Sequence, residues 1–300
     1  MTGPRRQPAG PNMGIGPKER QELRAAPETS LSKHSELAKR MANGEEKNVI
    51  RVASIYRYPV KGLTPERLSS ADLRVGEVIA GDRLYAIENG PSGFDPQAPQ
   101  WMPKIKFLCL MRNARLAAFS ARYDDETAVL SIERHGELLA AGDLKRPDGR
   151  RAIENFFETS MASERRGAFR VLEAPGHSFS DLAKKVVSII NLDTVEDFSR
   201  ALGLEVHPLR FRANLYLAGL PAWSEFDLMG KTLAIGEARL KIVKHTARCA
   251  ATEVNPETAL RDIDIPEILL RRRGNIDFGV YAEITATGKI AEGDPVGIPA

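Results

Sequence analysis

Short runs of β-branched and aromatic residues, separated by turn-forming residues, recur along most of the chain. Such runs are typical of short strands, and they occupy residues 49–58, 107–118, 128–132, 280–285 and 295–298. Residues 232–235 and 238–243 alternate apolar and polar positions and are joined by Gly236-Glu237, the pattern of a hairpin with glycine at its first turn position. Many short strands favour a barrel-like β architecture.

Only a few segments have helical signals, and the clearest are residues 150–160, 194–202 and 266–273. The second segment is preceded by Asp193, a favourable N-cap residue, and followed by Gly203, a residue at which helices commonly end. We therefore expect a fold that is mainly β with α+β decoration.

The charge balance and the cysteine count exclude several classes of protein. The 300 residues include 43 Lys and Arg and 40 Asp and Glu, a net charge of +3. Residues 1–48 carry the whole excess, so residues 49–300 are neutral and lack the basic surface that nucleic-acid binding requires. Two cysteines are too few for a disulfide framework or an iron–sulfur cluster and suit a reducing compartment, so we expect a cytoplasmic protein. No run approaches the ~18 apolar residues of a membrane-spanning helix, so no integral membrane segment is expected.

The first 47 residues differ in composition from the rest of the chain. The first aromatic residue is Tyr56, and the segment before it is rich in Pro, Gly, Ser and charged residues. Because such a segment buries too little apolar surface to offset its ordering entropy, residues 1–47 are predicted to be a disordered tail. A translation start assigned too far upstream of Met41 explains the same composition equally well.

The sequence lacks the common nucleotide and hydrolase motifs. It has no G-x-G-x-x-G after a strand, no P-loop and no G-x-S-x-G. The five histidines are scattered, and none is at metal-ligand spacing from another. The chain therefore shows no signature of a nicotinamide site, and its histidines predict no zinc site.

Several cations lie in turns and at strand ends within otherwise apolar segments. Lys61 follows Tyr58-Pro59-Val60 in a Pro/Gly turn, and Arg83 follows Gly81-Asp82. Arg210 and Arg212 are two residues apart, so an extended segment would place both on one face. Such cations are suited to bind an anion, because Arg forms bidentate contacts to phosphate and Lys contributes a point charge.

Cys249 follows Arg248 at the end of the predicted second strand of the hairpin. A thiolate is a soft metal ligand, and neighbouring cations favour its formation. The cations and the thiol together point to an anionic ligand that carries a soft metal.

The order of these motifs resembles the MOSC family, the molybdenum-cofactor-sulfurase C-terminal domain family, preceded by its usual N-terminal β-barrel domain. The segments that carry the resemblance are Tyr58-Pro59-Val60-Lys61-Gly62, Gly81-Asp82-Arg83, Ile190-Asn191-Leu192, Arg210-Phe211-Arg212-Ala213-Asn214-Leu215, Arg248-Cys249-Ala250-Ala251-Thr252, Gly279-Val280-Tyr281 and Gly293-Asp294. The resemblance covers about residues 49–300. It implies a β-barrel domain over residues 48–165 and a MOSC domain over residues 166–300.

The resemblance implies a molybdenum–molybdopterin cofactor, with the thiolate of Cys249 as the catalytic metal ligand. It implies that the pterin and its phosphate are bound by Lys61, Arg83, Ser188, Asn191, Arg212, Asn214, Thr246 and Arg248. The roles of Ser188, Asn191, Asn214 and Thr246 rest on the resemblance alone. Two positions depart from many relatives, which have Ser where this chain has Gly62 and Pro where it has Ala213.

The implied activity is that of the amidoxime-reducing component family, an oxidoreductase that reduces N-hydroxylated or otherwise N-oxygenated small molecules. Molybdenum would cycle between Mo(VI) and Mo(IV), with electrons from a separate flavin or ferredoxin-type protein. A non-redox alternative stays open, in which the protein carries molybdenum cofactor, or a sulfur atom on Cys249, to another protein.

Three groups of residues have structural interpretations beside the functional ones. Cys109 lies in an apolar run and is expected in the core. Arg210 could equally pair with a carboxylate such as Asp227 or Glu225. Arg261-Asp262 is interpreted as a pair of solvated charges.

Overall fold

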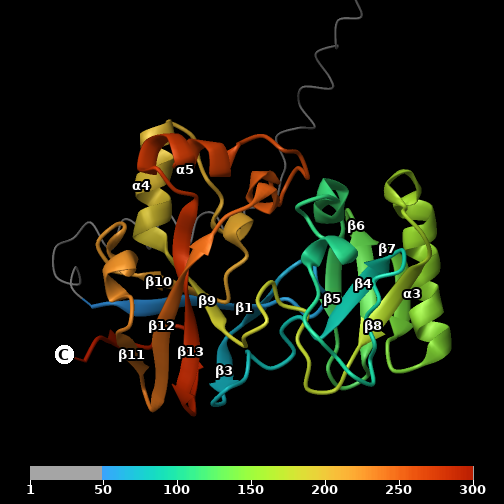
Figure 1. The fold of residues 1–300 in the computed structure, drawn as a ribbon, viewed down its shortest axis with the longest axis horizontal. Helices are drawn as coiled ribbons and strands as arrows, with labels where there is room; N and C mark the ends of the chain where they lie inside the picture. The colour runs from blue at the N-terminus through green and yellow to red at the C-terminus, as the bar shows by residue number, and fades with distance from the viewer. Residues whose placement is uncertain (1–48, 300) are drawn as a thin grey trace, which may run out of the picture. The chain divides into compact units, whose positions relative to one another are not determined.

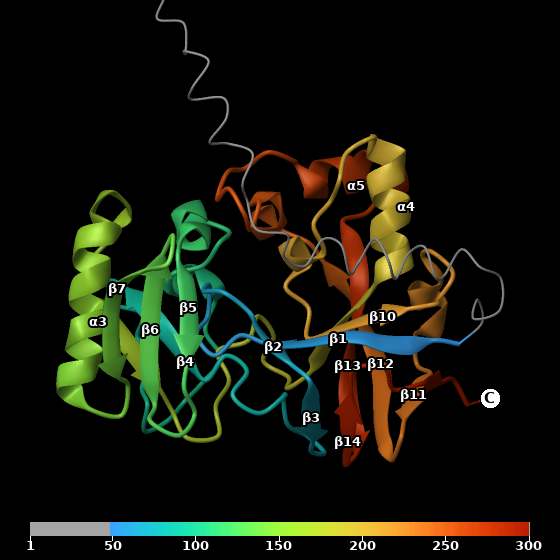
Figure 2. The same cartoon turned by 180° about the vertical axis from the view of Figure 1, so that it is seen from behind.

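The first strand of the described residues belongs to the sheet that the C-terminal strands form. The computed structural model describes residues 49–299 and places eight strands in one sheet, in the order β15-β11-β12-β13-β9-β10-β1-β2. β9 and β10 run parallel, and all other neighbours in this sheet are antiparallel. Figures 1 and 2 show β1 running across the sheet beside β10.

The described residues contain three α-helices among many short strands. The elements are β1 (Arg51–Arg57), β2 (Glu66–Leu68), β3 (Ser70–Leu73), β4 (Tyr85–Asn89), β5 (Ser120–Tyr123), β6 (Val129–Arg134), β7 (Glu137–Asp143), α3 (Pro147–Ser160), β8 (Phe169–Glu173), β9 (Val187–Asn191), α4 (Leu192–Leu202), β10 (Leu215–Ala218), β11 (Thr232–Ile235), β12 (Ala238–Ala247), α5 (Ile265–Arg273), β13 (Asp277–Ala286), β14 (Gly288–Ala291) and β15 (Val296–Gly297). The predicted mainly-β fold is therefore confirmed.

The elements form two lobes. The large lobe contains β1–β3, β9–β15, α4 and α5, and the small lobe contains β4–β8 and α3 (Figure 1). The small lobe has a three-stranded sheet, β5-β6-β7, and the pair β4-β8, while β3 pairs with β14 in the large lobe. The chain thus leaves the large lobe after β3 and returns to it at β9.

Each lobe has its own apolar core. In β1, a shift of register between Val52 and Ser54 lets Val52 and Ile55 both face the core of the large lobe, although they are an odd number of positions, three, apart. In the small lobe, α3 buries Ile153 and Phe157 against the strands. β1 thereby contributes to the core of a sheet whose other long strands come from the C-terminal part of the chain.

Several local predictions are confirmed in detail. β11 and β12 form the expected hairpin, in which Ile235 pairs with Ala238 and Gly236 has a φ of 54°. α4 and α5 end at Gly203 and Gly274, both left-handed. The N-cap of α4 is Asn191 and not Asp193, because the Asn191 side chain accepts a hydrogen bond from the Asp193 N–H.

One strand prediction is wrong. Residues 107–118 contain turns and a 3₁₀ helix, Ala114–Ala118, instead of a strand. Phe107, Leu108, Cys109 and Leu110 are buried, so the segment is apolar because it packs in the core and not because it belongs to a sheet. Residues 1–47, the predicted tail, lie outside the described residues. Among residues 49–299, no helix has the length and apolar character needed to cross a membrane.

Candidate functional site

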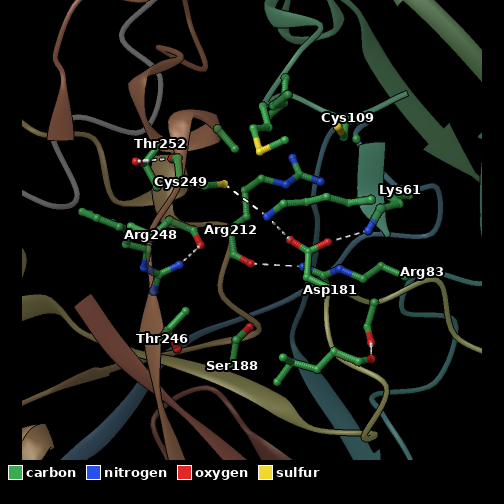
Figure 3. A pocket seen from close by; sticks show the side chains of 18 of the residues that line it. Lys61, Arg83, Cys109, Asp181, Ser188, Arg212, Thr246, Arg248, Cys249 and Thr252 are labelled. Carbon is green, nitrogen blue, oxygen red and sulfur yellow. Dashed lines mark hydrogen bonds and ion pairs between the residues drawn. The ribbon is translucent and has the colours of Figure 1, made fainter. Parts of the chain in front are cut away.

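One pocket gathers most of the predicted site residues from elements of both lobes. Lys61, Arg83, Ser188, Arg212, Asn214, Thr246, Arg248 and Cys249 line it, together with Asp82, Lys104, Cys109, Asp181, Arg210 and Tyr281. Figure 3 shows Lys61 and Arg83 on one side and Arg248 and Cys249 on the other, with Asp181 and Arg212 between them. Residues up to 220 positions apart in the sequence, Lys61 and Tyr281, are thereby placed around one space.

Two arginines of the pocket have a backbone conformation that is uncommon for residues with a side chain. Arg83 has a φ of 52° and Arg212 a φ of 51°. Their guanidinium carbons lie 4.7 Å and 4.3 Å from the centroid of the Tyr58 ring. Burial raises the pKa of Tyr58 to about 12, so the ring stays neutral and stacks with both cations. Asp82 accepts a hydrogen bond from the Tyr58 N–H at 2.8 Å and pairs with Arg83.

Asp181 joins two lysines of the pocket. Its carboxylate oxygens lie 2.5 Å from Lys61 Nζ and 2.8 Å from Lys104 Nζ. Burial lowers the pKa of Lys61. Burial also acts to lower the pKa of Lys104, but the Asp181 carboxylate outweighs it, so this pKa is raised. The pKa of Asp181 is held well below its usual range, because the two lysines outweigh its burial. Lys104 and Asp181 are therefore charged at neutral pH, and Lys61 is paired with the Asp181 carboxylate.

Cys249 is the second residue after β12, and it is the N-cap of a 3₁₀ helix, Ala250–Glu253. Its Sγ atom is 3.2 Å from Lys104 Nζ, so the ammonium group bridges the Asp181 carboxylate and the thiol. Cys249 is partly exposed and Cys109 is buried. Cys109 also lines the pocket, although the sequence placed it in the core, and burial raises its pKa.

Arg248 is buried and binds backbone carbonyl groups. Its Nε donates to Phe278 O at 2.7 Å and its Nη1 to Phe211 O at 2.9 Å. Burial lowers its pKa. A Cβ on the neighbouring Gly279 would come within 2.5 Å of Ile189 O and 3.2 Å of Arg248 Nη2. Any side chain at position 279 would therefore clash with the Ile189 carbonyl group and crowd the Arg248 guanidinium, and glycine avoids both contacts.

Three polar residues of the pocket differ in their hydrogen-bonding state. Ser188 Oγ donates to Asn214 Oδ1 at 2.8 Å, and Asn214 Nδ2 donates to Tyr56 O at 3.2 Å. These bonds connect β9, the residue that precedes β10, and β1. Thr246 is 2% exposed, and its Oγ1 has no hydrogen-bond partner among the described residues.

Asn191 is the one predicted site residue that the structure does not bring to the pocket. Its Nδ2 atom contacts Pro221 O at 3.0 Å and Glu225 Oε2 at 3.1 Å. Asn191 and Ser188 are three residues apart on β9, and an odd offset places two side chains on opposite faces of a strand. Ser188 faces the pocket, so Asn191 faces away from it and caps α4.

Arg210 differs from the sequence-based expectation in both conformation and partner. The segment is a 3₁₀ helix, Pro208–Phe211, and is not extended. Arg210 Nη2 pairs with Asp262 at 2.6 Å and not with Glu225 or Asp227. The neighbouring Arg261 donates to Leu110 O and Met111 O at 2.8 and 2.9 Å. Arg261 and Asp262 are both exposed, as expected for solvated charges, but their side chains also join the segment after Cys249 to its surroundings.

Sequence reasoning missed Lys104 and Asp181. Neither lies in a motif, and Asp181 lies among polar residues before β9 that have no periodic pattern. Their partners are 77 and 145 residues away along the chain, so no local signal distinguishes them from surface charges.

The pocket contains more positive than negative charge. Six cations line it, Lys61, Arg83, Lys104, Arg210, Arg212 and Arg248, whereas only Asp82, Asp181 and, behind Arg210, Asp262 balance them. Three of the six positive charges therefore have no carboxylate to balance them. Within residues 49–299, no group of three or more His, Cys, Asp and Glu side chains is arranged to hold a metal ion.

Comparisons with known proteins match this arrangement to a family. Residues 157–297 match the MOSC domain, and residues 49–174 match the MOSC N-terminal beta barrel domain. The chain is a MOSC-domain protein. Its eight-stranded sheet accordingly combines β1 and β2 of the N-terminal domain with strands of the MOSC domain.

Two curated relatives of this MOSC protein align over most of their length. Mitochondrial amidoxime-reducing component 1 of Mus musculus is 29% identical over 286 residues, covering 82% of this chain and 81% of the relative. The Homo sapiens protein of the same name is 22% identical over 280 residues, with 82% of each chain covered. Among solved structures, the YUAD protein of Bacillus subtilis is 10% identical, with a TM-score of 0.36, 83% of this chain covered and 94% of that chain.

Proposed function

We propose that this MOSC protein is an oxidoreductase that uses a molybdenum–molybdopterin cofactor to reduce N-hydroxylated or otherwise N-oxygenated small molecules. The observation that carries the proposal is the thiol of Cys249 in a pocket with three uncompensated positive charges. The similarity to the two amidoxime-reducing components supports it.

The side chains present in the pocket fit an anionic ligand that bears a metal. Cys249 offers a soft sulfur donor. The Arg212 guanidinium stacks on Tyr58 and has no hydrogen-bond acceptor among the described residues. Buried polar atoms are nearly always hydrogen-bonded, so the unpartnered Oγ1 of Thr246 is a group that a ligand would satisfy.

We assign the residues of the pocket to separate tasks. When bound, the cofactor supplies two-electron oxygen-atom-transfer chemistry, and the protein supplies orientation and charge compensation. Cys249 holds the metal, while Lys61, Arg83 and Arg212 bind the phosphate and the polar edge of the pterin. Arg248 orients the strand end that carries Cys249, because its hydrogen bonds go to backbone carbonyl groups.

The polar residues have smaller roles in this proposal. Thr246 contributes a hydrogen bond to the ligand. Ser188 and Asn214 shape the wall, since their side chains bind each other. Asn191 supports α4 and does not touch the ligand.

The proposal extends to partners, location and domain limits. Electrons come from a separate flavin or ferredoxin-type protein, because the chain has no nucleotide motif and too few cysteines for an iron–sulfur cluster. We also propose a cytoplasmic location and a domain division near residue 165. Cell fractionation tests the location, since the curated relatives are called mitochondrial.

The experiment that tests the function measures molybdenum first and turnover second. The protein is purified from a host that makes molybdopterin, its metal content is measured, and benzamidoxime reduction is assayed. We expect turnover with reduced viologen and none with NAD(P)H unless a reductase is added. A cofactor-loaded sample that is inactive with viologen would contradict the reductase function and favour the cofactor or sulfur carrier.

A further inference from the structure

The Asp181 carboxylate fills the gap between two ammonium groups inside the pocket. One oxygen lies 2.5 Å from Lys61 Nζ, a pair that Figure 3 shows, and the other lies 2.8 Å from Lys104 Nζ. Two lysines that converge on one point form a geometry suited to any oxyanion with two oxygens available. The carboxylate therefore marks the position at which the pocket binds negative charge.

Asp181 and Lys61, the two partners of this ion pair, are constrained to different degrees. The Asp181 side chain is 41% exposed, and Lys61 and Lys104 are its hydrogen-bond partners in the described part of the chain. The Lys61 side chain is only 5% exposed and also donates to Phe179 O at 2.8 Å. Asp181 can thus turn toward solvent, whereas Lys61 stays in place.

Lys61 cannot lose its counter-ion without compensation. A buried cation left without an anion is strongly unfavourable, and the neighbouring Arg83 and Arg212 add positive charge. The departure of Asp181 is therefore coupled to the arrival of another anion.

We propose that Lys61 and Lys104 form a binding site for a dianionic oxyanion, the phosphate group of a ligand, and that Asp181 occupies this site as an internal competitor. The inference rests on the proposed function only for the source of the phosphate. The site itself follows from the three side chains.

The competitor makes the site selective for charge. Asp181 is attached to the chain, so its effective concentration at the lysines is high, and a free monoanion gains nothing over it. A phosphate group carries up to two negative charges and three acceptor oxygens, and so replaces the carboxylate with a net gain.

The experiment measures binding of inorganic phosphate to the cofactor-free protein by titration calorimetry. Asp181→Asn should tighten phosphate binding by about tenfold, since one opposing charge leaves the site. Lys104→Met should weaken it by a similar factor. The matched control is Asp125→Asn, which removes an exposed carboxylate paired with Arg57 outside the pocket and should change the affinity less than about twofold.

A second measurement tests selectivity with acetate as the probe. The wild-type protein should not bind acetate measurably, while Asp181→Asn should. Phosphate affinity in Asp181→Asn that equals or falls below the wild-type value overturns the proposal. If Asp181→Asn does not fold, Lys104→Met tests the proposal in its place. Phosphate affinity in Lys104→Met that equals the wild-type value then overturns the proposal.

Cofactor-loaded protein distinguishes the two sources of phosphate. If the cofactor's own phosphate uses the lysine pair, added phosphate should not bind to loaded protein. If free phosphate is the ligand, loaded protein should still bind it. Neither arm measures turnover, so a failure here is separate from a failure of the reductase function.

Discussion

At the scale of single residues, the pocket depends on backbone conformations that side chains seldom adopt. Arg83 and Arg212 both have positive φ values, and such conformations cost about 1–3 kcal/mol each. Both arginines stack on the buried ring of Tyr58. The packing around Tyr58 therefore stabilises the two conformations that bring the guanidinium groups together.

Gly62 is the position at which this chain departs from relatives that have serine. It has a φ of 87°, and a Cβ there would lie 2.9 Å from Leu108 O. We expect Gly62→Ser to lower the free energy of unfolding by about 2–3 kcal/mol, since it adds a steric clash to backbone strain. The control is Gly93→Ser, which has a φ of 81° and open space around its Cβ. Equal losses of stability in urea denaturation of the two variants would contradict the role of the contact with Leu108.

The two cysteines should respond differently to substitution. Cys249→Ala should abolish or sharply lower molybdenum content and leave the melting temperature nearly unchanged, because the thiol is partly exposed at a strand end. Cys109→Ala should cost about 1 kcal/mol of stability, as usual for a small change at a buried site, and retain molybdenum. Metal analysis and thermal denaturation of both variants check this. Full molybdenum in Cys249→Ala would exclude the thiol as the ligand.

At the scale of elements, the start of α4 is held by a small buried polar network. Asn191 caps the helix, and its amide also reaches the Glu225 carboxylate, which accepts a hydrogen bond from Thr194 Oγ1 at 2.8 Å. Glu225 is 1% exposed, and its Oε1 has no partner among residues 49–299. The network connects α4 to the 3₁₀ helix Ser224–Leu228.

We expect Asn191→Ala to destabilise the protein without affecting cofactor retention. The variant loses the cap and leaves Glu225 with one partner fewer, a cost of about 2 kcal/mol. Urea denaturation measures the loss, and metal analysis measures retention. A molybdenum content that falls as sharply as we expect for Cys249→Ala would show that Asn191 belongs to the binding site.

The same network predicts a pH dependence of stability. Burial raises the pKa of Glu225, although hydrogen bonds from Thr194 and Asn191 act in the opposite direction. The folded protein then binds this proton more tightly than the unfolded chain, so the free energy of unfolding falls as the pH rises through the raised pKa. Glu225→Gln should remove this fall. A difference in stability between the two proteins that is constant with pH would contradict the prediction.

At the scale of the whole molecule, strands from the N-terminal part of the chain share the eight-stranded sheet and the core of the large lobe with the C-terminal strands. β1 lies between β10 and β2, and the core of the large lobe includes Val52, Ile55, Leu73 and Ile79 from the N-terminal part of the chain. A MOSC segment without residues 49–82 would expose that core and the edge of β10.

We therefore expect residues 166–300 alone to aggregate or remain unfolded, whereas residues 49–300 should unfold in a single cooperative transition. Calorimetry and circular dichroism of both proteins test this. A soluble, folded 166–300 fragment with a sharp melting transition would show that β1–β3 are dispensable for the MOSC sheet.

The sequence by itself determined the features that depend on local patterns. The alternation of apolar and polar residues and the Gly236-Glu237 turn were enough to predict the hairpin of β11 and β12. The conformational freedom of glycine was enough to predict where α4 and α5 end. These signals involve only residues that are close in the sequence, so they can be interpreted without knowledge of the fold. The motif order was likewise enough to name the family.

Only the tertiary structure decided which charges meet. Lys104 and Asp181 belong to no motif, yet their side chains join the small lobe to the segment before β9 and to Cys249. Asn191 lies in a motif, yet the alternation of β9 turns it away from the pocket, and Arg210 finds its carboxylate 52 residues away. The apolar residues within 107–118 pack in the core, but they form turns and a 3₁₀ helix and not a strand. Ion pairing and burial depend on distances in space between residues far apart in the chain, and these distances are set only once both lobes have folded.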